Sequence, residues 1–593
     1  MVTQNTTDIH HNLAENLDWR FAERNDTEVA QTLHRGEPVD AVHTLDEAGL
    51  LDGFFKFLEV HDILSHWQTF TIAGVYNVFL PAIYFLLLYG TRILFGIAST
   101  NALPDLLFSN VAVMTLLGFN AHLVAQGMTQ RGAQQRTGER PYVLMDPQTL
   151  ADTICKTAAS ELERLFNGTI QRLAAHQVFA LRIMAAVDGT RVTTTAKYKD
   201  CGCQKVTHRK RDTQGAWVKT VELVYGWRLI ALIDLGTLIP LAIKIVQIQE
   251  HEAPHLLALL QQAQVNLAPH SQIATLVVDR AYVDGPTLYE IDQLGITWYL
   301  IAKSNMHARR TALALSAEGQ VQERLEQVPH GQGRDATVET VRTRLVAVEG
   351  IRTWDAYRPP RTEVARLSFA ERPALNAVVL KEWRNHPPAE SGPRVILTNG
   401  SVDEPWTLVD AYDDRSWIEN GLFRNSKQFW TLTRWFPKKT AAGVRTHLTF
   451  VMLMVATATA YRLWDKAQSQ PTSAEPTHLA CPHPPVSEAK NETTEPNLPD
   501  PLRFAHSDLA GQGVARWRRE LRRVNRDKLI VFVDAQYGIF DIHEFMVLSG
   551  VPLRQLPDHL GTPADVLRRF GCLSDSDDNL NVKEHLSRQD TIP

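Results

Sequence analysis

The sequence predicts an α/β fold, in which strands and helices alternate around a large apolar core. Apolar runs of strand length cover residues 178–187 and 273–279, and a helical apolar pattern covers residues 256–265 between them. This mixture of signals is typical of a sheet with helices packed on it. Apolar residues make up 44% of the 593 residues and charged residues 21%, which excludes collagen-like, coiled-coil and fully disordered chains.

The N-terminal part is predicted to hold an acidic lead-in, residues 1–62, followed by a helical domain, residues 63–146. Residues 67–91 carry no charge and are long enough for a membrane span. Pro81 within this stretch, and the lack of a second such stretch, favour instead a buried helical hairpin broken near Pro81. Residues 102–131 are predicted as two short packed helices, with a DNA-binding helix-turn-helix as the alternative.

The central part of the chain is predicted to form the α/β core. The core occupies residues 147–309 and 395–466, and a β-rich insertion, residues 310–394, separates its two parts. The periodicity of apolar residues supports this division. Further predicted elements are helical residues 147–176, paired strands over residues 221–235 and 236–248, strand pieces at 337–348, 362–369 and 377–382, a strand at 395–398 and a helix over 411–430.

Residues 467–503 are rich in Pro, Ser, Thr and Glu, a composition typical of a linker. A small C-terminal tail domain, residues 504–593, follows, with a basic helix over 515–528 and an apolar strand over 529–533. The five cysteines are scattered and odd in number, and the chain opens on a polar, acidic segment rather than a signal peptide. These features predict a reducing, cytoplasmic compartment.

Three carboxylates are candidate site residues because of their positions. Asp188 and Asp279 each follow a buried apolar run, and Glu419 lies in a helical segment. A carboxylate at the end of a buried strand is poorly solvated and needs a cation or a catalytic role. Tyr412 and Arg415 share one helical face with Glu419, at spacings of three and four. Three carboxylates arranged in this way could hold two divalent ions.

Two basic stretches flank these carboxylates. Residues 191–211 hold seven Lys or Arg and one acid, and residues 420–464 hold seven Lys or Arg and no acid. Aromatic residues alternate with the cations in the second stretch, which suits phosphate neutralisation and base stacking. Residues 516–523 form a third basic patch, with no predicted chemistry nearby. The net charge of −5 excludes only a uniformly basic surface.

At these residues the sequence resembles a DDE transposase of bacterial insertion sequences, in the branch with a Tyr-Arg-Glu-Lys signature. The resemblance covers roughly residues 182–464, with a leader around residues 101–105. The matching pieces are Val187-Asp-Gly-Thr190, Val278-Asp-Arg-Ala-Tyr282, and Tyr412, Arg415, Ile418-Glu-Asn420, Phe423-Arg424 and Lys427. The resemblance implies an RNase H-like catalytic core with a β-rich insertion, which fits the 139 residues between Asp279 and Glu419.

The resemblance also implies roles for individual residues. Asp188, Asp279 and Glu419 would be the catalytic ligands of two Mg²⁺ ions, for which Mn²⁺ substitutes. The DNA contacts would come from Tyr412, Arg415, Lys427, Arg424 and Arg280. The implied reaction is metal-dependent cleavage at the transposon ends, followed by transfer of the freed 3′-hydroxyl to target DNA.

One residue departs from the signature. Lys is expected seven residues after Glu419, but Ser426 stands there and Lys427 follows. On a regular helix this shift turns the lysine by roughly 100° away from the face of Glu419. The role of Lys427 therefore depends on a loosened turn, for which Gly421 is the candidate.

The segment His251-Glu-Ala-Pro-His255 matches the zinc-protease pattern, in which two histidines on one continuous helix bind Zn²⁺. Pro254 suits a first helical turn, so the helix is predicted to begin near it and to leave His251 outside. Protease function is therefore disfavoured.

Cys201-Gly-Cys203 with His208 is a second possible metal site. Two cysteines without a second cysteine pair are a weak zinc signal, and a reduced hairpin turn is the preferred interpretation.

Other classes of function stay open on the sequence alone. A metal-dependent nuclease shares the metal chemistry without joining strands, and a domesticated protein on the same fold would bind DNA without cutting it. The expected partners are transposon inverted-repeat ends, target DNA and a second copy of the chain, because two ends must be brought together. No membrane partner is expected, and the expected location is the bacterial cytoplasm, at the nucleoid.

Overall fold

The structure is a computed structural model of the chain. It describes residues 23–45, 51–74, 80–119, 144–211, 217–330, 337–359, 369–385, 388–390, 392–469, 509–521, 525–534, 536–551 and 556–574.

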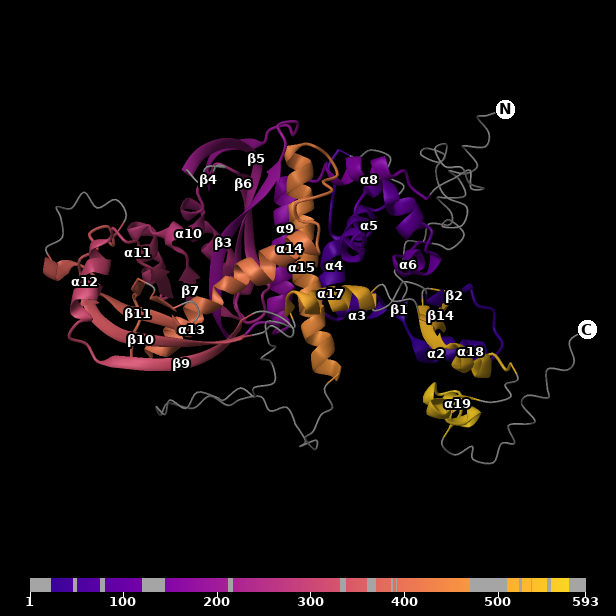
Figure 1. Ribbon diagram of the computed structural model, residues 1–593. Helices are drawn as coiled ribbons and strands as arrows, with labels where there is room; N and C mark the ends of the chain where they lie inside the picture. The colour runs from indigo at the N-terminus through magenta and orange to yellow at the C-terminus, as the bar shows by residue number, and fades with distance from the viewer. Residues whose placement is uncertain are drawn as a thin grey trace, which may run out of the picture.

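A mixed sheet of eleven strands forms the centre of the described fold (Figure 1). Its order is β4-β5-β3-β7-β8-β13-β11-β10-β9, with β6 paired to β5 and β12 to β11. Strand β3 runs parallel to β7, and β7 parallel to β8, while the other pairs are antiparallel. The strands are β3 (Arg182–Thr194), β4 (Gly202–Arg211), β5 (Trp217–Asp234), β6 (Pro240–Gln247), β7 (Gln272–Val278), β8 (Thr297–Ile301), β9 (Val321–His330), β10 (Thr337–Ile351), β11 (Leu375–Asn385), β12 (Pro388–Glu390) and β13 (Arg394–Thr398).

The strands of the predicted insertion continue the central sheet. Strand β11 pairs with β13, and β10 and β9 follow it outward. The predicted boundary after residue 309 falls inside helix α12 (His307–Leu315). The strand predicted at residues 362–369 lies almost wholly outside the described residues. Backbone pairing to β13 thus attaches these strands directly to the core.

Helices cover the sheet. Helix α10 (Leu256–Leu267) packs on β6, and α9 (Ala159–Ala175) packs on both α10 and α15 (Ala441–Ser469). The helical pattern over residues 147–176 forms two helices, because α8 (Pro147–Ile154) ends before α9 begins. Figure 1 shows α9 and α15 side by side between the sheet and the N-terminal helices. Helix α11 (Gly285–Gln293) lies between β7 and β8 in the chain and packs on β8.

The apolar stretch over residues 67–91 is continuous core only in its second part. Helix α5 (Ala82–Phe95) begins directly after Pro81 and is buried from Ile83 onward. The predicted hairpin of two helices meeting near Pro81 is not formed in the described part, because the preceding helix ends at Gln68, residues 69–74 are not helical and residues 71, 73 and 74 are exposed. Residues 75–79 lie outside the described part. Around α5 lie α3 (Leu51–Val60), α4 (Ile63–Gln68), the short helices η1 (Thr100–Ala102) and η2 (Pro104–Phe108), and α6 (Val111–Leu116). The second helix predicted before residue 131 lies outside the described residues.

One helix in the described part of the chain, α15, is long and apolar enough to cross a membrane by length and composition. The expectation that no second such stretch exists is therefore wrong. Of its most apolar 18-residue window, 83% is buried inside the protein, as in a core helix. Helix α5 and residues 100–108 pass the same test only as a pair bent by 94°.

Segments from both ends of the chain share a second sheet, of order β1-β15-β14-β2 (Figure 1). Residues 23–45 were expected in a solvated lead-in, but they form two of its strands and α2, because β14 and β15 supply backbone partners and an apolar face. Helix α17 ends at Leu521, short of the predicted residue 528, because residues 525–528 begin β14. The elements are β1 (Glu23–Arg24), α2 (Asp26–His34), β2 (Ala41–Leu45), α17 (Gln512–Leu521), β14 (Asn525–Val533), β15 (Gln536–Asp541), α18 (Ile542–Leu548), η9 (Asp558–Leu560) and α19 (Pro563–Arg569).

His447 on α15 makes the stability of the core depend on pH. Its Nδ1 accepts the hydroxyl of Tyr89 at 2.8 Å and its Nε2 donates to the carbonyl of Thr431 at 2.9 Å, so the neutral ring is fully satisfied. Burial, reinforced by Arg92, lowers the pKa of His447 to about 3. Folding thus opposes protonation, and stability present above the unfolded pKa is lost as pH falls.

We expect the free energy of unfolding to fall by about 1.4 kcal/mol per pH unit below roughly pH 6.5 on account of His447. His447→Gln should flatten this part of the curve, as measured by denaturant unfolding between pH 5 and 7.5. The exposed His208→Gln serves as the control and should leave the slope unchanged. Equal slopes for His447→Gln and the unmodified chain would contradict the assignment.

Candidate active site

The parallel pairing of β3 and β7 brings Asp188 and Asp279 together. Val187 pairs with Val278, and the two aspartates are the next residues on each strand. Strand β7 ends at Val278, whereas β3 continues to Thr194, paired with β5. The prediction that Asp188 ends its strand is therefore wrong. It lies inside β3, where the parallel neighbour stops and one side of the strand becomes accessible.

The surroundings of Asp188 disfavour the ionised form of its side chain. Its Oδ1 accepts the backbone N–H of Gly189 at 2.7 Å, and its Oδ2 lies 3.5 Å from Nη1 of Arg415. Its side chain is only 15% exposed. Burial, together with the nearby carboxylates of Glu252 and Glu419, raises the pKa of Asp188 to about 7 despite these two contacts. A further positive charge at this point would stabilise its ionised form.

Asp279 follows β7 and caps the short helix η5 (Arg280–Tyr282). Its Oδ1 accepts the backbone N–H of Arg280 at 2.6 Å. Burial raises the pKa of Tyr412 to about 12, and the charge of Asp279 acts in the same direction. Asp279 and the tyrosine therefore lie in one electrostatic neighbourhood.

The third carboxylate, Glu419, comes from a helical segment that packs on β3 and on the end of β7. Helix α13 (Pro405–Asp414) brings the Tyr412 hydroxyl 3.5 Å from the carbonyl of Val278. Arg415 follows, and its Nη2 lies 3.2 Å from Oε1 of Glu419, while its Nη1 contacts Asp188. The guanidinium thus links a strand carboxylate to the helical one. Tyr412, Arg415 and Glu419 share one face, as their spacing predicts.

A π-helical turn lies between Glu419 and Lys427. Residues Ile418–Phe423 form η8, with i→i+5 hydrogen bonding, before α14 (Arg424–Gln428) resumes the α-helix. A π turn accommodates one extra residue compared with an α turn. The eight-residue step from Glu419 to Lys427 across η8 therefore turns the chain about as far as a seven-residue step on a regular α-helix. The Lys427 side chain is exposed in the described part of the chain. The neighbouring protein atoms still remove some of its water, which lowers the pKa of its ammonium group.

Gly421 sits within η8 and packs closely. A Cβ at this position would lie 2.9 Å from Cδ1 of Leu238 and 3.5 Å from the ring of Trp417. The sequence pointed to this glycine as the residue that loosens the turn, and the loosened turn is present.

Lys427→Ala should weaken cleavage by roughly 10-fold, because one phosphate-neutralising charge is lost without a change in packing. Gln428→Ala, next to it in α14 and also exposed, is the matched control and should leave cleavage unchanged. Strand-cleavage rates at saturating DNA measure the effect. Equal rates for the lysine variant and the control would show that η8 does not return Lys427 to the DNA.

A fourth carboxylate, Glu252, lies beside Asp188 and was not among the predicted site residues. Arg228 Nη1 contacts it at 2.5 Å, and the Tyr282 hydroxyl donates to it at 3.1 Å. A Cβ on Gly189 would come within 2.5 Å of this carboxylate, so a larger residue there would have to displace the Glu252 side chain. In the sequence Glu252 lies in the zinc-protease-like segment His251–His255, and no local pattern links it to Asp188.

The two remaining residues predicted to contact DNA, Arg280 and Arg424, border different clefts. Arg280 borders a cleft of about 580 Å³ beside Asp279, with Lys303, Ser304, Asn305 and Arg309. Arg424 borders a separate cleft of about 740 Å³, together with Arg516 and Arg519 of α17.

The third basic patch, expected to lack chemistry nearby, therefore lies against η8 and α14, next to the helical turn that carries Glu419. Helix α17 is held there by the contact of Trp517 with Trp430, and Arg518 stacks 5.0 Å above the Trp430 ring. The sequence could not show this, because the packing joins segments almost a hundred residues apart.

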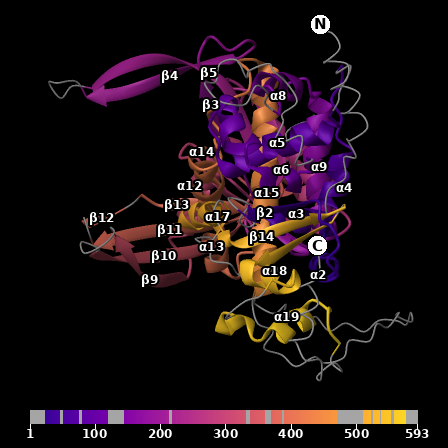
Figure 2. The same ribbon diagram turned by 90° about the vertical axis from the view of Figure 1, so that its right-hand side faces the viewer.

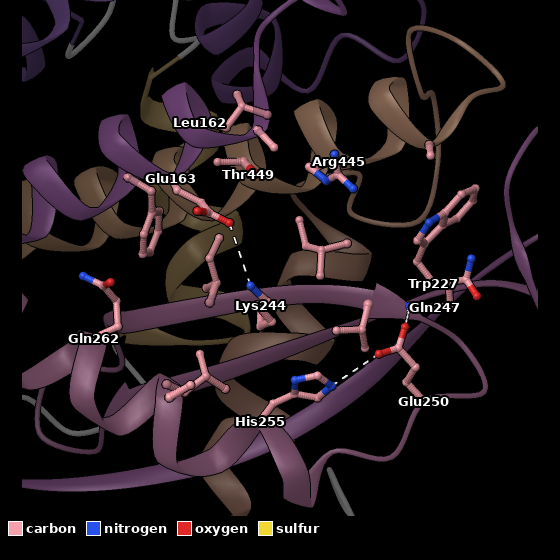
Figure 3. A pocket seen from close by; sticks show the side chains of 18 of the residues that line it. Leu162, Glu163, Trp227, Lys244, Gln247, Glu250, His255, Gln262, Arg445 and Thr449 are labelled. Carbon is pink, nitrogen blue, oxygen red and sulfur yellow. Dashed lines mark hydrogen bonds and ion pairs between the residues drawn. The ribbon is translucent and has the colours of Figure 1, made fainter.

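A third cavity lies apart from the candidate site. It measures about 730 Å³ and lies between α9, β6, α10 and α15 (Figure 3). Figure 3 shows the Lys244–Glu163 pair at 3.9 Å and the His255–Glu250 pair at 3.5 Å on its walls. None of the three predicted carboxylates lines it.

Neither alternative metal motif has the geometry it needs. Helix α10 begins at Leu256, after the short helix η4 (Ala253–His255), so His251 lies outside the helix as predicted. Cys201 lies in the turn before β4, and Cys203 lies on the strand as a free thiol.

The carboxylates of Asp188 within β3, Asp279 after β7 and Glu419 fit a divalent cation by their chemistry, although their side chains do not converge on one point. Among the described residues, no group of three His, Cys, Asp or Glu side chains is close enough to hold a metal ion. Arg415 separates Asp188 from Glu419, whose side chain is 56% exposed. Carboxylate oxygens are the ligands that hard divalent cations prefer, and a cation would favour the ionised form of Asp188, whose pKa burial raises.

These features define an α/β domain with an acidic centre where β7 ends beside the continuing strand β3, and with cationic clefts around it. Residues 181–456, slightly less than half of the chain, match the family model of the transposase DDE domain. The match begins one residue before β3, ends within α15 and includes all the predicted site residues. It supports a transposase, a class of enzyme that acts on DNA and generally uses divalent metal ions. No curated protein matches the chain.

Proposed function

We propose that this protein is the transposase of an insertion sequence. It binds the inverted-repeat ends of the element, cleaves phosphodiester bonds there and joins the freed 3′-hydroxyl ends to target DNA. The observation that carries the proposal is the placement of Asp188 and Asp279 on adjoining strands, with Glu419 tied to Asp188 through Arg415. This arrangement lies within the matched DDE domain.

Asp188, Asp279 and Glu419 would hold two Mg²⁺ ions, with Mn²⁺ able to replace them. When bound, such ions activate the attacking water or hydroxyl and stabilise the leaving oxygen. The protein supplies the remaining electrostatics. Arg415 offers a planar, permanently charged group to a phosphate, and it sits against both carboxylates so that its orientation is fixed.

The surrounding cations would carry the DNA. Arg280 and Lys303 border the cleft beside Asp279, and Lys427 follows the π turn. Tyr412 holds the helical segment against β7 and would contact a neighbouring phosphate. Arg424, with Arg516 and Arg519, would contact DNA on the other side of α14.

The strand order β6-β5-β3-β7-β8, with parallel pairing only at β3, β7 and β8, supports an RNase H-like core carrying β9–β12 as its insertion. Two ends must meet in one complex, so we propose at least a dimer during the reaction. The helical residues 63–146 are the proposed region for DNA binding or dimerisation. The proposed location is the cytoplasm, at the nucleoid.

The decisive experiment uses the purified full chain, Mg²⁺ and the DNA that flanks its gene, with every nick and joined strand mapped. Cuts at paired inverted repeats followed by joining, and absent without divalent metal, would establish the proposal. Cuts without joining would identify a nuclease instead. Binding without cuts, with Mn²⁺ also tested, would identify a DNA-binding protein that has lost the reaction.

A further inference from the structure

Part of β5 leaves the central sheet and forms a two-stranded ribbon with β4. Pairing of β5 with β3 stops at Tyr225 and pairing with β6 stops at Trp227, so residues 217–224 pair with β4 alone. Figure 2 shows this hairpin extending away from the body of the molecule, on the same side as β9–β12. Gly226 lies where the ribbon departs, with φ of +145°, and a Cβ there would clash with the carbonyl oxygen of Val192.

One face of the ribbon combines cations with exposed apolar side chains. Lys205 pairs with Leu223, Thr207 with Val221, and Arg211 with Trp217. The exposed fractions are 50% for Leu223, 65% for Val221 and 64% for Trp217. The guanidinium of Arg211 lies 5.1 Å above the Trp217 ring. Lys219 stands on the same face by its position in the strand.

The opposite face differs. Glu222, the one acid among the described residues of the hairpin, lies there and contacts His208 at 3.2 Å. Among the described residues, the face that exposes Trp217, Val221 and Leu223 therefore carries lysine and arginine side chains but no acidic one. An isolated hairpin is marginally stable in water, and exposed apolar side chains in such a ribbon are typical of a surface that binds a partner.

The base of the ribbon joins the other basic stretch. The backbone N–H of Lys199 donates to the carbonyl of Lys439 at 3.0 Å, and Lys199 bridges to Thr440. Tyr198 packs edge-on against Trp227 and Phe436 at 6.2 and 5.9 Å between ring centroids. The two basic stretches of the sequence therefore meet at the base of the ribbon.

We propose that the β4–β5 ribbon is a DNA-binding arm that enters a groove of the duplex bound at the active site. The inference rests on the proposed function for the identity of that duplex. A two-stranded ribbon fits a major groove about 12 Å wide. Lys205, Arg211 and Lys219 would neutralise phosphates, while Trp217 and Val221 contact bases or sugars.

The reach of the arm sets where it would bind. Fourteen residues of β5 separate Trp217 from Ala231, the partner of Asp188. At about 3.4 Å per residue this is about 48 Å, the length of about 14 base pairs. The arm therefore contacts DNA within about 14 base pairs of the cleaved bond and adds affinity for the end rather than chemistry.

The test measures binding of the full chain to duplex DNA as a function of salt, without divalent metal. Lys205→Gln with Arg211→Gln should lower the slope of log affinity against log salt by about 2. Trp217→Ala should weaken binding roughly 10-fold with the slope unchanged. The control on the opposite face, Val218→Thr, should alter neither. Equal thermal unfolding of all variants would show that the core is intact.

A second set of measurements distinguishes failure of this inference from failure of the proposed function. Wild-type chain should bind an end carrying 20 base pairs inside the cut site more tightly than one carrying 5, and the ribbon variants should lose this preference. Because binding needs no cleavage, a chain that cuts nothing still tests the arm. Unchanged slope and length preference would overturn the inference, as would variants that lose only self-association or only binding to anionic vesicles.

Discussion

Asp279→Asn should abolish strand cleavage while leaving binding to DNA ends nearly unchanged. The substitution keeps the size of the side chain and removes its charge at the point where β7 ends beside Asp188. A metal ligand that stabilises the transition state by several kcal/mol accounts for a loss of roughly 10³-fold or more. Asp188→Asn and Glu419→Gln should behave alike, because the three carboxylates act as one unit.

The measurement is the rate of strand cleavage at saturating Mg²⁺ and DNA, with end binding followed separately by mobility shift. Asp410→Asn is the matched control, since Asp410 lies on α13 but its side chain is 56% exposed and paired with Arg324. This control should cut at the wild-type rate. Normal cleavage by Asp279→Asn would remove the aspartate from the site and with it the metal-binding assignment.

Arg415→Lys should lower cleavage by roughly 10- to 100-fold, although the charge is conserved. The guanidinium reaches Asp188 at 3.5 Å and Glu419 at 3.2 Å with two different nitrogens. A single ammonium is a point charge and cannot hold both carboxylates while also presenting a flat edge to a phosphate. Arg415→Gln removes the charge too, and roughly 10²- to 10³-fold is expected.

Arg324→Lys is the control for this series, because Arg324 pairs with Asp410 of helix α13 at 2.7 Å and does not border the cleft beside Asp279. Cleavage rates and end affinity should both be measured. A loss confined to affinity would place Arg415 in DNA binding alone, whereas a loss confined to rate supports its position at the reacting phosphate. Wild-type rates for Arg415→Lys would contradict the bridging role.

Much of the core could be predicted from the sequence because it depends on local patterns. The apolar runs before Asp188 and Asp279 predict two strands, and these strands pair with each other. The spacing of Tyr412, Arg415 and Glu419 predicts a shared helical face, and this face packs against the two strands. The strand at Arg394–Thr398 and the helix α10 also appear where expected. A buried strand and an amphipathic helix each leave a repeating pattern, which survives without knowledge of the partners.

The features that escaped prediction depend on distant partners. The sequence predicts only a basic stretch where strand β4 lies, because the exposed side chains of β4 do not form the apolar pattern of a core strand. Glu252 belongs to the site only because Arg228 and Tyr282 hold it beside Asp188. The acidic residues 23–45 gain strand structure from backbone partners at residues 525–541. Such long-range pairing leaves no signal in either segment alone.

The sheet built from both ends has a consequence for synthesis of the protein. Strands β1 and β2 leave the ribosome about 480 residues before β14 and β15 exist. At roughly 5–20 residues per second they wait about 25–100 s for their partners. A chain released early by a premature stop would carry unpaired strand edges, which favour aggregation and proteolysis. Fragments that could compete for DNA ends would thereby be removed, and full-length chains would be favoured.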